Sequence, residues 1–163
     1  MDKTYYIFRH GETRATSHKR WYWHEYYSAT ILEEGKPSIM KLAEYLKRVK
    51  TDYNVSSPFV RCRQTAELVT QITGKTFTFD SRIREYGLEL PWTFKRRLLR
   101  FIKDLETSKY NTILICTHAI VIEMLIQYLE HGRINMSERI SAPFPGILTI
   151  ITHNKSQTLN FNQ

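Results

Sequence analysis

Two histidines of this sequence follow short apolar runs that have the character of buried strands. Residues 5–8 lead into Arg9 and His10, and residues 112–116 end just before a threonine and His118. Aliphatic and aromatic runs of this length are typical of strands in α/β proteins. In open α/β sheets, ligands bind outside the carboxyl ends of the strands. The sequence therefore predicts one site that contains both histidines.

The residue types at these positions suit phosphoryl transfer. A neutral imidazole such as His10 can attack phosphorus and leave again, which divides a hydrolysis into two displacements. The charge on the phosphoryl oxygens must be neutralised, and the guanidinium groups of Arg9 and Arg61 can do this through paired hydrogen bonds. His118 can donate a further hydrogen bond to these oxygens, and the backbone N–H groups that open the next helix at Ala119 add affinity for an anion.

An oxygen that leaves from an alkyl phosphate also needs a proton. Glu85 is the candidate donor, and Glu12 and Glu89 remain open as alternatives. Arg63 remains an alternative to Arg61 as a phosphate ligand. The structural alternative for Arg61 itself is a salt bridge on the surface of a helix.

Four blocks of the sequence, in this order, resemble the histidine phosphatase superfamily, the phosphoglycerate mutase-like proteins. They are Arg9-His10-Gly11-Glu12-Thr13, Ser57-Pro58-Phe59-Val60-Arg61 with Gln64-Thr65-Ala66, Ile83-Arg84-Glu85 with Gly87, and Ile115-Cys116-Thr117-His118. The resemblance implies a phosphohistidine intermediate on His10, with no metal or other cofactor. It assigns phosphate contacts to Arg9, Arg61 and His118, and proton donation to Glu85.

Two departures from the family pattern bear on the substrate. Thr16 stands where many members carry an asparagine, so the phosphate contact at this position is open. The segment between Glu85 and the last strand of the core is short, whereas larger members carry a helical region there that covers the substrate. We therefore expect an open pocket. This favours a phosphatase over a mutase, which must protect its intermediate from water.

The same resemblance leaves two substrate classes. Small members of the family include phosphohistidine phosphatases that act on signalling proteins and generally lack the acidic glutamate. The presence of Glu85 favours phosphomonoesters instead, although the compact architecture also fits a phosphoprotein substrate. We expect either a phosphorylated small molecule or a phosphoprotein as the partner, and the sequence does not predict an oligomeric state.

Composition bounds the class of protein. The chain has 163 residues, 42% of them hydrophobic and 25% charged, as expected for one soluble domain that spans 1–163. No apolar run reaches the roughly 18 residues of a membrane span, and no secretory signal precedes the first strand, so we expect a cytoplasmic protein. Cys62 and Cys116 form neither a disulfide framework nor a metal motif.

The formal net charge of +8 favours anionic partners. Much of this charge lies on residues 92–105, which show the pattern of a basic amphipathic helix with its apolar residues facing inward. A nucleic-acid-binding module without catalysis is therefore the alternative of another class.

The alternation of elements predicts a three-layer α/β/α sandwich with a mostly parallel central sheet. Residues 14–30, rich in aromatic side chains, are expected to form a loop packed as a flap over the site. The further expected strands are 76–79, one around Val55, and a terminal hairpin of 147–151 and 158–161 that turns at 154–156. The expected helices are 33–50, one that ends at Gly74, 92–105 and 119–130.

Overall fold

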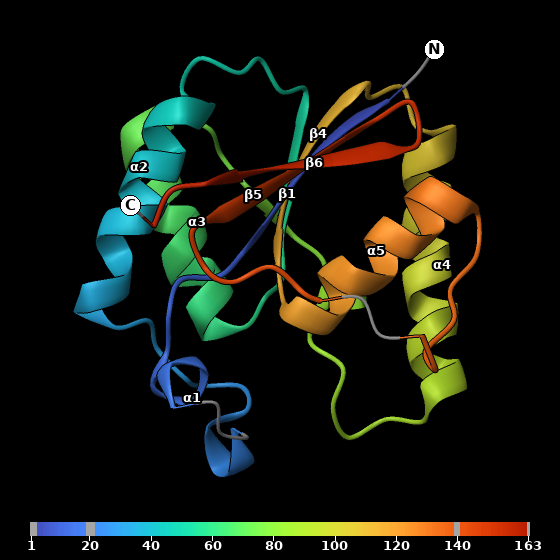
Figure 1. Ribbon diagram of the computed structural model, residues 1–163, viewed down its shortest axis with the longest axis horizontal. Helices are drawn as coiled ribbons and strands as arrows, with labels where there is room; N and C mark the ends of the chain where they lie inside the picture. The colour runs from blue at the N-terminus through green and yellow to red at the C-terminus, as the bar shows by residue number, and fades with distance from the viewer. Residues whose placement is uncertain (1–2, 19–21, 139–140, 163) are drawn as a thin grey trace.

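Six strands assemble into one sheet in the order β3-β2-β4-β1-β5-β6 (Figure 1). The computed structural model describes residues 3–18, 22–138 and 141–162. The first four strands of the chain run parallel, whereas β5 is antiparallel to both β1 and β6. The strands are β1 (Thr4–Arg9), β2 (Tyr53–Ser56), β3 (Thr78–Phe79), β4 (Thr112–Thr117), β5 (Ile147–Thr152) and β6 (Lys155–Asn160). The predicted mostly parallel sheet with a C-terminal antiparallel hairpin is confirmed.

Helices cover both faces of this sheet, which gives the predicted three layers (Figure 1). One face carries α2 (Lys36–Leu46) and α3 (Val60–Thr73), and the other carries α4 (Pro91–Thr107) and α5 (Ala119–His131). A short helix, α1 (Arg14–Ser17), follows β1. Three single turns of 3-10 helix lie at Trp23–Glu25, Glu33–Gly35 and Ser81–Ile83.

The central strands are buried on both faces, which explains why their sequences are continuously apolar. Successive side chains of a strand point to opposite faces. Ile7 and Ile115 accordingly join the core under α4 and α5, while Phe8 and Leu114 join the core under α2 and α3. The periodicity predicts that Phe94, Leu98, Leu99, Ile102 and Leu105 of α4 face inward. All of these are buried except Leu99, which is partly buried, and Phe101 is buried in addition.

Some element boundaries differ from the expected ones. The helix expected over 33–50 is α2, which begins beside Pro37, a residue suited to a first helical turn because it lacks an N–H. It ends at Leu46 because the next turn tightens: the N–H groups of Arg48 and Val49 bond to carbonyls only three residues back. The expected strand 76–79 shrinks to β3, whose two residues are exposed at the edge of the sheet.

Two local motifs also refine the expectations. The 14–30 segment is not wholly a loop, because Thr13 and Thr16 form a capping box that starts α1. The terminal hairpin turns at His153 and Asn154 instead of 154–156. Their φ angles of 52° and 57° are typical of a two-residue turn whose twist matches the flanking strands.

Candidate active site

The two histidines leave neighbouring parallel strands at the same edge of the sheet. Arg9 at the end of β1 pairs in register with Thr117 at the end of β4. The backbone N–H of His10 then donates to the carbonyl of Thr117 at 3.0 Å. As a result the imidazole rings of His10 and His118 lie edge to face with centroids 5.2 Å apart, and both are fully buried.

The hydrogen bonds of His10 fix the position of its proton. Its Nδ1 lies 2.8 Å from the carbonyl oxygen of Gly11, which can only accept, so Nδ1 carries the hydrogen and Nε2 keeps a lone pair. Burial lowers the pKa of this imidazole well below its usual value, and the positive charges of Arg9 and Arg61 lower it further. His10 is therefore a neutral ring whose Nε2 carries the lone pair.

Hydrogen bonds connect the turn after His10 to α3. The N–H of Gly11 donates to the hydroxyl of Thr65 at 2.9 Å, and this hydroxyl donates to the carbonyl of Arg61 at 2.7 Å. A side chain at Gly11 would approach the Cγ2 of Ile31 to 3.3 Å, so the turn is tightly packed. The first and second blocks of the sequence thus form one rigid unit.

Arg61, in the first turn of α3, points its guanidinium at His10. Its Nε donates to His10 Nε2 at 3.3 Å, and its Nη1 donates to the carbonyl of Tyr26 at 2.7 Å. The guanidinium carbon lies 4.2 Å from the ring centre of Tyr22. Arg61 is completely buried, yet among the described residues none of its hydrogen-bond or ring partners is a carboxylate. The surface salt bridge considered for Arg61 is therefore wrong.

Two buried donors in this cluster have no hydrogen-bond partner among the residues that the structure describes. They are Nη2 of Arg61 and Nε of Arg9. Arg9 lies close enough to Arg61 and to Glu85 for their charges to affect its pKa, although burial has the larger effect and lowers it. An unpaired donor on a buried cation costs free energy, so a site with two of them is suited to an oxyanion.

Glu85 is the carboxyl group of this cluster. Its Oε2 lies 4.0 Å from Nδ1 of His118, and its Oε1 accepts from the backbone N–H of Tyr86 at 3.0 Å. Burial raises its pKa, against the opposing effects of Arg61 and Arg9. A carboxyl group in these surroundings holds its proton to a higher pH than an exposed one and can act as an acid.

The two alternative acids lie elsewhere. Glu89 makes a salt bridge with Arg97, with Nε of the arginine 3.1 Å from each carboxylate oxygen. Glu12 lines a separate cavity together with Gly35. Geometry therefore favours Glu85 among the three carboxylates that the sequence left open.

His118 caps the start of α5, and Ser57 orients its ring. The hydroxyl of Ser57 lies 2.7 Å from Nε2 of His118 and accepts from the N–H of Phe59 at 3.4 Å. The hydroxyl hydrogen is then free to be donated to Nε2, which leaves the ring hydrogen on Nδ1, the nitrogen on the side of Glu85. Burial lowers the pKa of His118 well below its usual value, and the positive charge of Arg61 lowers it further.

A cover from the 14–30 segment closes over the cluster. The Tyr22 ring stacks on the guanidinium of Arg61, and the Tyr22 hydroxyl lies 3.0 Å from that of Thr13. The Tyr26 hydroxyl donates to the carbonyl of Glu85 at 2.6 Å. Any side chain at Gly87 would collide with this phenol, since a Cβ there would lie 2.3 Å from its oxygen.

The position of Tyr22 and Tyr26 bears on two predictions, the flap and the open pocket. The flap expected from residues 14–30 is confirmed for Tyr22 and Tyr26, the residues that make the contacts above. The open pocket expected from the short segment after Glu85 is wrong for this structure, because His10, His118 and Arg61 have no exposed surface. The covering side chains come from before α2, a part of the chain that the argument from segment length did not consider.

Three further residues were predicted as phosphate ligands or as alternatives, namely Ala119, Thr16 and Arg63. The backbone N–H of Ala119 is the first in α5, directly after His118. The hydroxyl of Thr16 bonds to the backbone of Thr13 in the cap of α1, so its contact with a phosphate stays a prediction. Arg63 is exposed on the outer side of α3, where it donates to the carbonyl of Pro58 at 2.8 Å and stacks on Phe79.

Sequence reasoning gave no role to several residues that support the cluster. Ser57 and Thr65 stand in the second block, and their place beside Arg61 was the available signal. For Tyr22 and Tyr26 the only signal was the density of aromatic residues, which does not say which ring contacts the site.

Two further findings concern the described residues as a whole. Within the described ranges, no three His, Cys, Asp or Glu side chains gather as they would around a metal ion. None of the helices described is both long and apolar enough to cross a membrane.

Comparison with known proteins assigns the chain to a family. A sequence profile of the histidine phosphatase superfamily (branch 1) matches residues 5–91 and 87–161. The "Probable phosphoglycerate mutase GpmB" of Citrobacter koseri is 32% identical over 83 residues, which are 51% of this chain and 38% of that protein. The match to this curated relative therefore spans less than half of the relative's length.

Solved structures share the fold at lower sequence identity. The alpha-ribazole phosphatase from Shigella flexneri aligns with a TM-score of 0.72 at 18% identity, covering 98% of this chain and 96% of that one. The mycobacterial glucosyl-3-phosphoglycerate phosphatase, solved with VO3, aligns with a TM-score of 0.76 at 17% identity, covering 91% and 90%. Together with the profile match over nearly its whole length, these findings show that the chain belongs to the histidine phosphatase superfamily.

Proposed function

We propose that this protein is a phosphatase that hydrolyses phosphomonoesters through a phosphohistidine on His10, as one catalytic domain spanning the chain. The observation that carries the proposal is a pair of buried donors on Arg9 and Arg61 that have no partner within the described ranges. They lie beside the Nε2 lone pair of a neutral imidazole. A phosphoryl group placed there meets a nucleophile and two cations at once.

In the first step, the lone pair of His10 Nε2 attacks phosphorus and the bond to the ester oxygen breaks. Arg61 Nε donates to this lone pair in the resting protein, so the guanidinium must turn to the phosphoryl oxygens before attack. Glu85 gives its proton to the departing oxygen, which leaves as an alcohol. The products of this step are phosphohistidine and the Glu85 carboxylate.

In the second step, water attacks the phosphohistidine. The Glu85 carboxylate takes a proton from the water, whose oxygen bonds to phosphorus while the bond to Nε2 breaks and its electron pair returns to the ring. His118 donates from Nδ1 to a phosphoryl oxygen, with the amide of Ala119 adding a further donor. The inorganic phosphate then leaves, and Glu85 is protonated again.

The raised pKa of Glu85 supports phosphomonoesters as the substrate class, because an alkoxide leaves only when it is protonated. The cover of Tyr22 and Tyr26 supports a small phosphorylated molecule over a folded phosphoprotein. A phosphohistidine on a folded protein needs no acid and would have to reach fully buried groups. The phosphatases among the structural neighbours are consistent with small substrates.

The intermediate can be trapped directly. A radiolabelled aryl phosphate is mixed with the protein and quenched within milliseconds. We expect acid-labile, alkali-stable label on the wild type and none on His10→Ala. His131→Ala, at an exposed histidine that ends α5, is the matched control and should keep the label. Label that persists on His10→Ala would place the nucleophile elsewhere and refute the mechanism.

The role of Glu85 is tested by the leaving group. Glu85→Gln keeps the shape of the side chain but removes the proton donor. We expect kcat/KM to fall by roughly 10²–10⁴ on alkyl phosphates and far less on aryl phosphates, whose phenolate leaves without help. Glu12→Gln is the charge-matched control and should change neither rate by more than about twofold.

Two outcomes of the leaving-group experiment would count against the assignment. Equal losses on both ester classes would show that Glu85 acts through position and not through its proton. A wild type that barely cleaves alkyl phosphates but rapidly clears phosphohistidine would exclude phosphomonoesters and favour a signalling-protein substrate.

A further inference from the structure

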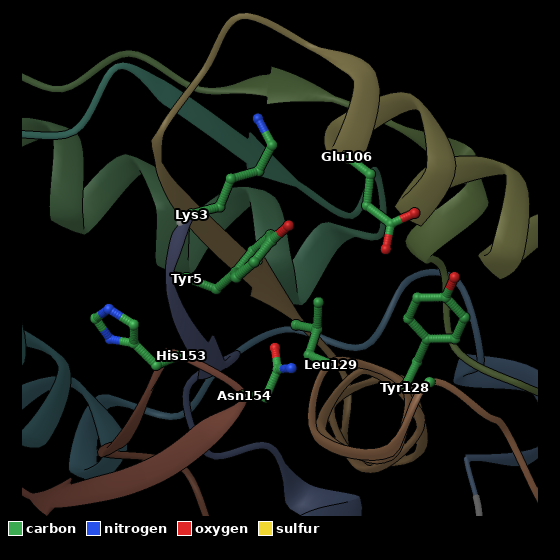
Figure 2. A pocket seen from close by; sticks show the side chains of 8 residues that line it. Lys3, Tyr5, Glu106, Tyr128, Leu129, His153 and Asn154 are labelled. Atoms are coloured by element: carbon green, nitrogen blue, oxygen red, sulfur yellow. The ribbon is translucent and has the colours of Figure 1, made fainter. Parts of the chain in front are cut away.

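A second cavity lies at the opposite end of the sheet from the reactive histidines (Figure 2). It has a volume of about 360 Å³ and is lined by residues at the start of β1, the ends of α4 and α5, and the β5–β6 turn. Tyr5 lines it and lies five residues before His10 on β1, so the two sites are roughly 15 Å apart along the strand. A volume of this size is sufficient for a small organic ligand.

Tyr5 brings an unused polar group to this cavity. The residue is only 6% exposed, and its ring reaches into the cavity with the hydroxyl toward the side of Glu106 (Figure 2). No hydrogen bond joins this hydroxyl to another of the described residues. Burial raises the pKa of Tyr5 to about 12, with further contributions from Glu106 and Tyr128. The phenol is therefore neutral and can donate or accept a hydrogen bond.

Glu106 gives the cavity a negative charge. It stands in the last turn of α4, where the helix dipole makes a carboxylate unfavourable. The end of α5, at Leu129 and Gly132, adds the partial negative charge of a second helix terminus. Within the described part of the chain, no cation forms a salt bridge with Glu106. Glu106 is exposed, and the hydroxyl of Tyr128 interacts with its carboxylate. Burial raises the pKa of Tyr128 most, and the charge of Glu106 and a side-chain hydrogen bond with it raise it further. A carboxylate has several acceptor positions, so Glu106 can still accept from a ligand.

Lys3, the cation at the edge of the cavity, does not neutralise this charge. Its ammonium donates to the carbonyl of Ser108 at 2.9 Å and to the carbonyl of Tyr110. The cavity thus offers a ligand a carboxylate, a phenol hydroxyl, aromatic surface and the aliphatic side chain of Leu129. The side chains of His153 and Asn154 line its other side.

We propose that this cavity binds a small organic cation with a primary ammonium group. The ammonium donates to the carboxylate of Glu106 and to the hydroxyl of Tyr5, and its alkyl part packs on Leu129. The aromatic rings of Tyr5 and Tyr128 favour a cation further. A general electrostatic attraction cannot account for such binding, because the chain has a net charge of +8. This inference is independent of the reaction at His10.

Butylamine is a suitable probe, with butan-1-ol and butyrate as neutral and anionic controls of similar size. Amide NMR shifts of the full chain are followed during titration. We expect saturable shifts around Tyr5, Glu106 and Leu129 with butylamine in the millimolar range, as for other ligands of this size. The two controls should give no saturable shifts there. Saturation by butyrate or butan-1-ol at the same concentrations would overturn the proposal.

Two variants separate the groups in this site. Glu106→Gln should weaken butylamine binding by about two- to fivefold, because an ion pair with an exposed carboxylate is lost. Tyr5→Phe should weaken it by about fivefold while the protein stays folded, because the hydroxyl has no partner to lose. Glu44→Gln, at an exposed position of α2, removes the same charge elsewhere and should bind as the wild type does.

Unchanged affinity in Glu106→Gln would refute the site. The titration is repeated on His10→Ala, which lacks the proposed nucleophile but keeps the cavity. Binding equal to wild type there would support two independent sites. Loss of binding in His10→Ala would contradict the assignment of the amine to this cavity.

Discussion

Replacing Arg61 with methionine tests whether the site is built for an anion. The substitution keeps a long, unbranched side chain but removes the charge. In the part of the chain that the structure describes, the hydrogen-bond partners of Arg61 are an imidazole and the carbonyl of Tyr26, and its Nη2 has none. The structure thus holds a fully buried cation whose hydrogen bonds reach no carboxylate.

Two opposing effects set the stability of Arg61→Met without ligand. The buried carbonyl of Tyr26 loses its donor, which costs about 1–3 kcal/mol. Removing a poorly compensated buried charge relieves a desolvation penalty of several kcal/mol. We therefore expect the free energy of unfolding to fall by less than about 2 kcal/mol, or to rise. A guanidinium in a satisfied buried ion pair would instead lose about 3–5 kcal/mol on this change.

Inorganic phosphate should reveal the difference in a thermal melt. At phosphate near 100 times its dissociation constant, the wild type should gain about 2.7 kcal/mol. For a chain of this length the gain corresponds to a Tm increase of about 5–11 °C. Arg61→Met should show almost no increase at the same concentration, because the main ligand of the phosphate is gone.

Arg63→Met is the matched control, since Arg63 is an exposed arginine on the same helix. It should keep the full phosphate response. A loss of more than about 3 kcal/mol in ligand-free Arg61→Met, with the phosphate response retained, would refute the anion site and give Arg61 a structural role. Loss of the phosphate response in Arg63→Met alone would transfer the role to that residue.

Two further predictions concern the histidines. Ser57→Ala removes the hydroxyl bonded to Nε2 of His118. Nitrogen NMR should then show a shift of the ring hydrogen from Nδ1 toward Nε2, and kcat should fall by about 10²–10³. Ser57→Thr should restore both, and an unchanged tautomer in Ser57→Ala would disprove the role of Ser57. The pKa values of His10 and His118 are lowered in the folded protein, so as pH falls below about 6.5 these histidines are protonated first in the unfolded chain. Each histidine should therefore lower the free energy of unfolding by about 1.2 kcal/mol between about pH 7 and 5.5. Glu85, with a raised pKa, acts in the opposite direction, so the contribution of His10 is measured as the difference between wild type and His10→Asn, and identical pH profiles would contradict it.

Much of the site could be predicted from the sequence because the two strands that lead to the histidines are parallel. Apolar runs that end in Arg9-His10 and in His118 carry their own positional information, since parallel strands bring their carboxyl ends to one edge. Helix α4 could likewise be predicted from the sequence, because its buried residues recur at helical spacing. Both signals are local patterns that a packed core imposes on the chain.

Other features depend on contacts between distant segments and left no such pattern. Tyr22 covers Arg61 across 39 positions of the sequence, and no periodicity marks it. Glu85 could not be separated from Glu89 until the salt bridge of Glu89 with Arg97 was known. The cover of the site was misjudged because its depth was inferred from the length of one segment, while another segment supplied the aromatic rings.

The placement of the two histidines has a consequence for how such a protein changes over evolution. Their rings are 5.2 Å apart, close to the roughly 4.8 Å between neighbouring strands, so the spacing of the reactive groups is inherited from the backbone of the sheet. In the proposed mechanism, the segments of Tyr22 and Gly87, outside the strands, would meet the rest of a substrate. New substrates can therefore be acquired by rewriting these segments while the interatomic distances of the reaction stay untouched.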